Sequence, residues 1–418
     1  FVDSVNTFWL DEYNVDGFRF DFTKGFTNNS SSDEGWSYDQ QRIDVLKRIT
    51  DEIRKTNSDT YVILEHFTEN REEKELADYG MMLWGNMNSA YNEATMGYNS
   101  GGKSDFSGVS YQERGWSDPR LVGYMESHDE QRLMYKNLQY GNSGEEYDIT
   151  KVKTALDRIE LAATFFIPVP GPKMIWQFGE LGYDYSIDYD CRTCPKPVKW
   201  EYYEDEDRKA LYNLFKVLIH LRKNHEVFGT DDFSLSVSGA MKRIVLRHSS
   251  SDVVIVGNFG VSEDKIDPDF TKTGTWYEAF SQDSIEVDDA NSELTLSAGE
   301  YRMYSTERFV LTDIIGSSEL DAITEIQSFA RESKIDVFPN PARDIVTFEF
   351  ESSGYSEILL NIYNMSGQKV TSVRKAALSS GENRIEWSKS AGNASNPSMY
   401  FYELLVGDER YTGKFLKY

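Results

Sequence analysis

The chain has 418 residues, enough for two to four domains, and its 44 Lys and Arg against 70 Asp and Glu give a formal net charge of −26. This excess of carboxylates excludes nucleic acid as an expected partner, because phosphate contacts need clustered Lys and Arg. No apolar run approaches the roughly 18 residues of a transmembrane helix. Aromatic residues make up 14% of the chain and suit stacking on sugar rings, although they more often pack cores.

The chain begins at Phe1 rather than at Met and shows no signal peptide, so we expect it to start partway through a domain. Its two cysteines, Cys191 and Cys194, form a single CxxC segment. No second pair completes a zinc site and no βαβ context supports a redox motif. We therefore expect a loop with two free thiols or one local disulfide.

Short apolar segments alternate with helical patterns over the first half of the chain. Strands are expected near Arg19, Ile63, Leu83, Val122 and Ile175, and residues 86–118 read as a long loop. Helices are expected over residues 1–10, 40–55, 71–79, 150–166 and 207–223. This alternation predicts βα units around a parallel sheet, as in a (β/α)8 barrel. Five of eight barrel strands are accounted for, and the other three would have to precede Phe1.

The second half of the chain is dominated by short strands with turn residues between them. It predicts all-β structure from about residue 231 onward, in two sandwich domains. The predicted fold class is therefore an α/β barrel truncated at its N-terminus, followed by two β-sandwiches. The expected boundaries are 1–228 for the barrel part, 229–305 for the first sandwich, 306–334 for a polar linker and 335–418 for the last sandwich.

The segment Asp16–Asp21 has the alternation of a β-strand, with its two aromatic residues on one side and Arg19 and Asp21 on the other. A guanidinium beside a carboxylate keeps it ionised and oriented, as a nucleophile requires. A structural ion pair at a strand end is the alternative.

Three carboxylates, Asp21, Glu65 and Asp129, fall at the ends of predicted strands. Parallel barrel strands open their C-terminal ends on one face, so these side chains are expected to converge. Two carboxyl groups roughly 5 Å apart suffice for retaining glycoside hydrolysis, one as nucleophile and one as acid/base. A third carboxylate can stabilise the cationic transition state.

The segments that end in Asp21, surround Glu65 and end in Asp129 resemble, in order, three of the four signature segments of the α-amylase superfamily of glycoside hydrolases. The resemblance covers about residues 1–305. It implies Asp21 as nucleophile, Glu65 as general acid/base and Asp129 as transition-state stabiliser. The substrate-binding residues that it implies are Arg19, Lys24 and His128.

The implied activity is a retaining hydrolase of starch-like or glycogen-like α-glucan. Ser127 gives the sequence Ser-His-Asp-Glu, which is similar to that of glucan branching enzymes, and residues 170–180 lean the same way. Branching or glucanotransferase activity is therefore the alternative, since both reactions pass through a glycosyl-enzyme intermediate. A glucan-binding surface protein without catalysis is a third hypothesis, which the three intact carboxylates argue against.

Several further side chains near the predicted strand ends have two interpretations. His66 is expected to support the site rather than bind a ligand. Trp84 and Trp116 can stack on sugar or pack the barrel, and Glu180 can contact substrate or cap a turn. No cofactor is certain; calcium is possible, and its candidate ligands, Asn86, Asp105 and Asp118, are more typical of a solvated loop.

The last domain carries Pro-Asn-Pro-Ala at 339–342 within the segment 337–344. With residues 362–367, 399–402 and 413–417, it resembles a type nine (Por) secretion sorting domain. That resemblance implies an enzyme exported across a Gram-negative outer membrane, released or surface-attached, with the secretion machinery as partner. An accessory β-sandwich or carbohydrate-binding module is the alternative.

Overall fold

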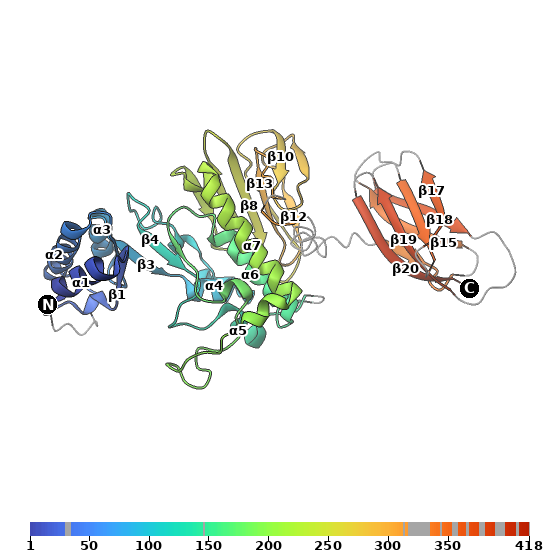
Figure 1. The fold of residues 1–418 in the computed structure, drawn as a ribbon. Helices are drawn as coiled ribbons and strands as arrows, with labels where there is room; N and C mark the ends of the chain where they lie inside the picture. The colour runs from blue at the N-terminus through green and yellow to red at the C-terminus, as the bar shows by residue number, and fades with distance from the viewer. Residues whose placement is uncertain are drawn as a thin grey trace. The chain divides into compact units, whose positions relative to one another are not determined.

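In the computed structural model, the chain forms two compact units, Phe1–Ala330 and Arg331–Tyr418 (Figure 1). The described residues are 1–29, 35–144, 147–311, 314–316, 335–342, 345–352, 358–364, 368–375, 381–388, 398–406 and 409–417. Most of the expected linker, 306–334, lies outside these residues.

Five parallel strands form a curled half-barrel in the order β1-β2-β3-β4-β5, which confirms the predicted fold class. The register pairs Arg19 with Ile63, Leu83 with Leu121, and Gly123 with Lys173. Because all five strands run the same way, the segments that follow them emerge at one edge. The strands are β1 (Gly17–Phe20), β2 (Tyr61–Leu64), β3 (Met82–Asn86), β4 (Leu121–Tyr124) and β5 (Lys173–Met174).

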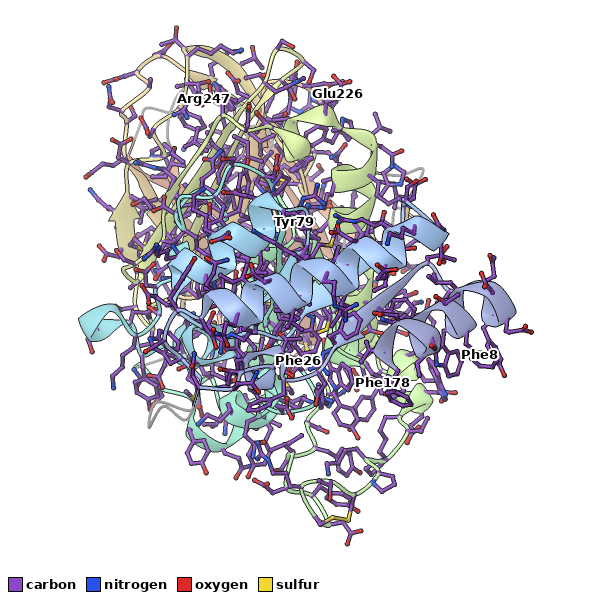
Figure 2. The ribbon with its side chains drawn as sticks, turned by 90° about the vertical axis from the view of Figure 1, so that its left-hand side faces the viewer. Phe8, Phe26, Tyr79, Phe178, Glu226 and Arg247 are labelled. Atoms are coloured by element: carbon purple, nitrogen blue, oxygen red, sulfur yellow. A yellow bond between two sulfur atoms is a disulfide. The ribbon has the colours of Figure 1, made fainter. Side chains whose placement is uncertain are left out.

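Helices connect these strands and cover the half-barrel. Ile43, Leu46, Ile49 and Ile53 of α2 are buried in one core with β2 and β3, and the Asp39 side chain caps this helix. In Figure 2, α2 crosses the near face of the half-barrel. The helices are α1 (Val2–Tyr13), α2 (Gln40–Thr56), α3 (Asn70–Asp78), α4 (Asn88–Thr95), α5 (Leu133–Tyr140), α6 (Val152–Phe166) and α7 (Glu206–Asn224). Short 3₁₀ turns are η1 (Thr23–Gly25), η2 (Ser100–Gly102), η3 (Ser107–Val109), η4 (Gly179–Leu181), η5 (Trp200–Glu204) and η6 (Glu226–Gly229).

The structure differs from the sequence predictions at three elements. α4 lies inside the expected loop 86–118, where Asn86 Oδ1 accepts a hydrogen bond from the Asn88 N–H at the start of the helix. α5 was not expected. β5 ends at Met174 rather than near Phe178, because the chain leaves the strand and Phe178 takes a left-handed conformation with φ 63°.

An antiparallel six-stranded sheet, in the order β11-β10-β13-β8-β7-β6, packs against α6 and α7. Phe165 of α6, Leu214 of α7 and Ile255 of β8 belong to the same buried cluster. The strands of this part are β6 (Phe233–Ser236), β7 (Met241–Arg247), β8 (Asp252–Asn258), β9 (Asp264–Ile266), β10 (Gly274–Glu278), β11 (Ser284–Val287), β12 (Leu294–Leu296) and β13 (Tyr301–Ser305).

The second unit contains a three-stranded sheet, β14-β15-β18, and a four-stranded sheet, β17-β16-β19-β20. Phe348, Leu360, Trp387 and Phe415 are among its buried core residues. Its strands are β14 (Asp336–Phe338), β15 (Ile345–Ser352), β16 (Ile358–Tyr363), β17 (Lys369–Lys375), β18 (Gly381–Ser388), β19 (Ser398–Val406) and β20 (Glu409–Lys417). Within the described parts of both units, no helix has the length and apolar character needed to cross a membrane.

Arg158 of α6 ties the half-barrel to the antiparallel sheet. Its guanidinium is fully buried and donates to the carbonyls of Ala94 and Thr95 on α4. It also donates to the carbonyls of Asn258, at the end of β8, and of Phe259 and Gly260 after it. One buried guanidinium thus joins the two parts, although other N–H groups also reach the carbonyls of Ala94, Asn258 and Phe259.

We expect Arg158→Ala to lower the free energy of unfolding by roughly 3–5 kcal/mol, because the hydrogen bonds of a buried guanidinium are lost and its removal leaves a cavity. Arg247→Ala, at a partly exposed arginine on β7, is the matched control and should change it by less than about 0.5 kcal/mol. Urea unfolding followed by tryptophan fluorescence measures both. Equal stabilities of the two variants would contradict this role of Arg158.

Candidate active site

The segments that follow β1 and β2 run side by side. The Glu65 N–H donates to the carbonyl of Phe20 at 3.0 Å, and the Thr23 N–H donates to the carbonyl of Glu65 at 2.8 Å. The register of the two strands thus continues beyond their ends. It brings Asp21 and Glu65, which are far apart in sequence, to the same point at the edge of the sheet.

Arg19 contacts both of these carboxylates. Its Nη1 lies 2.5 Å from Asp21 Oδ1, and its Nη2 lies 2.8 Å from Glu65 Oε2. The guanidinium carbon of Arg19 lies 4.1 Å from the ring centroid of Trp84. This cation–π contact fixes the plane of the guanidinium. One cation therefore holds two carboxyl groups in a defined arrangement.

The two carboxyl groups have different environments and opposite pKa shifts. The Asp21 side chain is 75% exposed, whereas that of Glu65 is 13% exposed. The hydrogen bond from Arg19 and a hydrogen bond with Glu65 lower the pKa of Asp21. Burial raises the pKa of Glu65, and its interaction with Asp21 raises it further. These opposite pKa shifts suit Asp21 to remain ionised and Glu65 to carry a proton.

A left-handed residue completes the turn beside Glu65. Phe22 has φ 46° and ψ 47°, a conformation that a bulky residue rarely adopts. This conformation directs its N–H to Glu65 Oε2 at 2.9 Å. The strain is compensated by the hydrogen bonds around it, and it fixes the Glu65 carboxyl group relative to the backbone.

A buried polar chain lies behind the turn. Thr23 Oγ1 is 2.8 Å from His66 Nδ1, and His66 Nε2 is 2.7 Å from Glu72 Oε1. Arg42 donates to both Glu72 oxygens at 2.6 and 2.8 Å. Burial lowers the pKa of His66 although Glu72 opposes that shift. His66 thus supports the turn from within, in the role that the sequence favoured.

The loop after β4 carries His128 and Asp129 to the same edge. The His128 ring lies 6.2 Å from Trp84, the residue that also contacts Arg19, and its charge contributes to lowering the pKa of Asp21. His128 Nε2 is 3.3 Å from Asp129 Oδ2, and both side chains are about half exposed, at 44% and 52%. Burial raises the pKa of the Tyr124 hydroxyl, and the charges of Glu130, Glu65 and Asp129 raise it further.

Hydrogen bonds within the loop after β4, and one from the end of β3, hold the segment around Asp129. Its N–H donates to Ser127 Oγ at 3.1 Å, and the Ser127 hydroxyl donates in turn to Glu130 Oε2. Asn86, at the end of β3, donates to Glu130 Oε1 at 2.5 Å. The sequence analysis gave Glu130 no role of its own, although it lies in the Ser-His-Asp-Glu sequence directly after His128 and Asp129.

The structure does not bring every predicted residue to this cluster. The Lys24 ammonium lies 5.4 Å from the ring of Phe22, and no described contact joins it to the three carboxylates. Trp84 and Trp116 are 7% and 4% exposed and pack rather than present a face for sugar. Glu180 lines a separate groove along α7. Among the described residues, no three His, Cys, Asp or Glu side chains are grouped to hold a metal ion.

A cavity of about 430 Å³ adjoins His128 and Asp129. The sequence analysis missed most of its walls, because they come from two segments with no strong motif. Trp176, 5.6 Å from the His128 ring, follows β5, and Arg192 lies between the two cysteines, which form a disulfide. The full lining is His128, Asp129, Arg132, Trp176, Gln177, Phe178, Tyr183, Ile187, Arg192, Thr193, Cys194, Lys196 and Pro197.

The fold of the first unit is that of α-amylases. The chain is similar to the Anoxybacillus α-amylase, with a TM-score of 0.52, 16% identity and coverage of 74% of this chain and 62% of that chain. It is similar to the Geobacillus thermoleovorans α-amylase complexed with acarbose, with a TM-score of 0.53, 15% identity and coverage of 74% and 63%. A cyclomaltodextrin glucanotransferase, CldA, gives a TM-score of 0.51, 14% identity and coverage of 74% and 59%. The chain thus spans less than two thirds of the length of each of these neighbours.

Residues 336–417 match the family described as the secretion system C-terminal sorting domain. The predicted resemblance of the last domain is confirmed by this match. No curated protein matches the sequence of the chain.

We expect Arg19→Gln to raise the pKa of both Asp21 and Glu65, because the guanidinium favours the ionised form of each. In the parent protein, Asp21 should titrate below its ordinary value of 3.8 and Glu65 above 4.5. Carboxyl ¹³C NMR titration, assigned with Asp21→Asn and Glu65→Gln, measures these values. Unchanged pKa values in Arg19→Gln would contradict the shared ion pair.

Proposed function

We propose that the chain carries the nucleophile, the acid/base and the transition-state stabiliser of a retaining α-glucan hydrolase of α-amylase type. The observation that carries the proposal is the single Arg19 guanidinium shared by an exposed carboxylate of low pKa and a shielded carboxyl group of raised pKa. This is the pair of environments that a glycosidase needs for its two steps. The α-amylase fold supports the same reaction class.

In the first step, Asp21 attacks the anomeric carbon while Glu65 donates its proton to the leaving glycosidic oxygen. Asp21 suits attack because its carboxylate is ionised and open to the substrate, and Arg19 holds it in orientation. Glu65 suits donation because burial raises its pKa and so favours the protonated form. In the second step, Glu65 accepts a proton from water, which attacks the glycosyl-enzyme intermediate and releases Asp21.

Asp129 and His128 complete the proposed site. The half-exposed Asp129 carboxylate is available to the positive charge that develops on the sugar ring in the transition state. The neighbouring His128 ring offers a hydrogen-bond partner to ring hydroxyls. Lys24 remains a candidate for substrate binding on resemblance alone, since its ammonium lies over Phe22.

Glucanosyl transfer is the second candidate reaction. The observation that favours it is Ser127, which gives the Ser-His-Asp-Glu sequence and whose hydroxyl donates to Glu130 Oε2. Transfer differs from hydrolysis only in the acceptor, a sugar hydroxyl instead of water.

The sorting domain favours an enzyme that is exported by type nine secretion and then acts on polysaccharide outside the outer membrane, released or surface-attached.

We expect Glu65→Gln in the native full-length protein to lose turnover by about 10²- to 10⁴-fold, because an amide has no proton to donate to the leaving group. Binding of maltooligosaccharide should remain within a few-fold of the parent. Reducing-end release and calorimetric titration measure the two properties. Turnover close to that of the parent would remove Glu65 from the acid/base role.

Hydrolysis and transfer predict different products from soluble starch. A hydrolase raises the number of reducing ends as the iodine colour falls, because each cleavage leaves a new end. A branching transferase lowers the iodine colour while reducing ends stay nearly constant. We expect reducing ends to rise; a constant count with falling colour would replace hydrolysis by transfer.

A further inference from the structure

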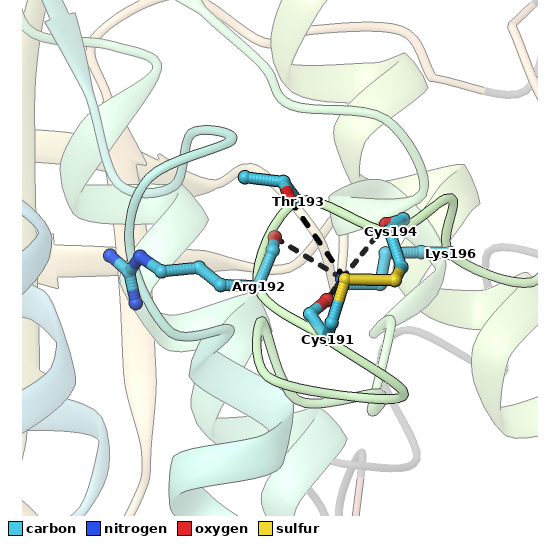
Figure 3. Close-up of a disulfide and its surroundings, with 5 residues drawn as sticks. All are labelled: Cys191, Arg192, Thr193, Cys194 and Lys196. Atoms are coloured by element: carbon cyan, nitrogen blue, oxygen red, sulfur yellow. Dashed lines mark hydrogen bonds between the residues drawn. A yellow bond between two sulfur atoms is a disulfide. The ribbon is translucent and has the colours of Figure 1, made fainter.

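The disulfide between Cys191 and Cys194 closes a short loop against the segment that carries Asp129. Arg192 lies between the two cysteines, and its Nη2 donates to the backbone carbonyl of Asp129 at 2.5 Å. Figure 3 shows its side chain extending away from the sulfur bridge, on the side opposite Lys196. Its Nη1 is 3.5 Å from Asp188 Oδ1. The loop thus reaches the main chain of a residue of the proposed site through one side chain.

The loop itself is held from within. Lys196 Nζ donates to the carbonyls of Cys191 at 2.6 Å, Cys194 at 2.9 Å and Arg192 at 3.4 Å. An ammonium has three donors, so this loop uses all of them. The disulfide and the lysine together give Arg192 a fixed backbone from which to reach Asp129.

A second contact anchors the chain that leads into the loop. Gln131 Oε1 accepts the Ile187 N–H at 3.0 Å, and Gln131 Nε2 donates to Ser186 Oγ at 3.0 Å and to Asp188 Oδ2 at 3.2 Å. Gln131 is two residues beyond Asp129, so these hydrogen bonds fix the segment of Asp129 relative to residues 186–188. The Arg192 contact is the end of a continuous set of hydrogen bonds rather than an isolated one.

The backbone around Asp129 is therefore held on both sides. Its N–H donates to Ser127 Oγ, and its carbonyl accepts from Arg192. Its carboxylate contacts His128 and is half exposed, so it is accessible to the substrate. A displacement of about 1 Å in a group that acts on the transition state can cost on the order of 10²-fold in rate. A contact that fixes this carbonyl acts on turnover without touching the sugar.

We propose that Arg192 is a positioning residue for Asp129 and that the Cys191–Cys194 disulfide keeps it in place, so that reduction of this bond slows turnover. The proposal rests on the role proposed above for Asp129. In the reduction, a dithiol gives two electrons: the S–S bond breaks, each sulfur takes up one proton, and the reductant leaves as a cyclic disulfide. The sequence contains no other cysteine, so a thiol reductant has one target in this chain.

The first test compares Arg192→Ala with Arg247→Ala, a matched arginine on β7, in the native full-length protein under oxidising conditions. We expect the kcat on maltooligosaccharide to fall about tenfold in Arg192→Ala with KM within about twofold, and Arg247→Ala to match the parent. Affinity for a cationic iminosugar, which mimics the charge of the transition state, should fall by a similar factor. Loss of affinity for maltotriose itself by the same factor would show that Arg192 binds sugar directly and would overturn the positioning role.

The second test uses the disulfide. Dithiothreitol should lower the kcat of the parent to the level of Arg192→Ala, and a Cys191→Ser/Cys194→Ser variant should start at that level and not respond to the reductant. Far-ultraviolet circular dichroism checks that each protein is folded. If the double variant does not fold, the test is the kcat of the parent before and after reduction. A parent that turns over glucan equally well with its disulfide reduced would overturn the proposal and leave the proposed function intact. A parent without turnover or iminosugar binding would overturn both.

Discussion

The Arg19 guanidinium, shared between Asp21 and Glu65, is the interaction on which the candidate site depends. Two carboxylates at one point repel each other, and a fixed cation between them offsets that repulsion. The two carboxyl groups differ in their exposure to solvent. Asp21 is open and remains ionised, whereas Glu65 is shielded and keeps its proton more readily. Trp84 holds the plane of the guanidinium and also contacts His128, which connects this pair to the segment of Asp129.

The rest of the first unit maintains that geometry. The parallel register of β1 and β2 continues past the strand ends and sets Asp21 beside Glu65. The buried chain of Thr23, His66 and Glu72 fixes the turn from below. The antiparallel sheet contributes no carboxylate to the cluster, but it covers α6 and α7 with apolar surface. These layers explain how an acidic chain holds three carboxylates at one edge of a sheet.

Local pattern was sufficient to predict the five strands of the half-barrel and most helices, and it selected Asp21, Glu65 and Asp129 as candidate carboxylates. The alternation around Arg19 and the β-branched run before Glu65 are properties of a few neighbouring residues. α4 was missed because its Asn-rich and Ser-rich sequence is typical of a loop, and its buried Asn88 donates to the carbonyl of Met125, which only the fold brings near. The position of Arg192 depends on a tertiary contact with Asp129, so spacing in the sequence contained no information about it. The CxxC spacing fits both two free thiols and one local disulfide, so the state of the cysteines stayed open until the structure gave the disulfide.

The most direct test of the central claim is to trap the glycosyl-enzyme intermediate. An α-glucosyl fluoride with a second fluorine on the sugar ring forms the intermediate and slows its breakdown. Treatment of the native full-length protein with this reagent, followed by proteolysis and mass spectrometry, identifies the modified residue. The account predicts one glucosyl adduct, on Asp21, that is absent from Asp21→Asn. An adduct on another carboxylate, or turnover of the reagent by Asp21→Asn at the parent rate, would contradict it.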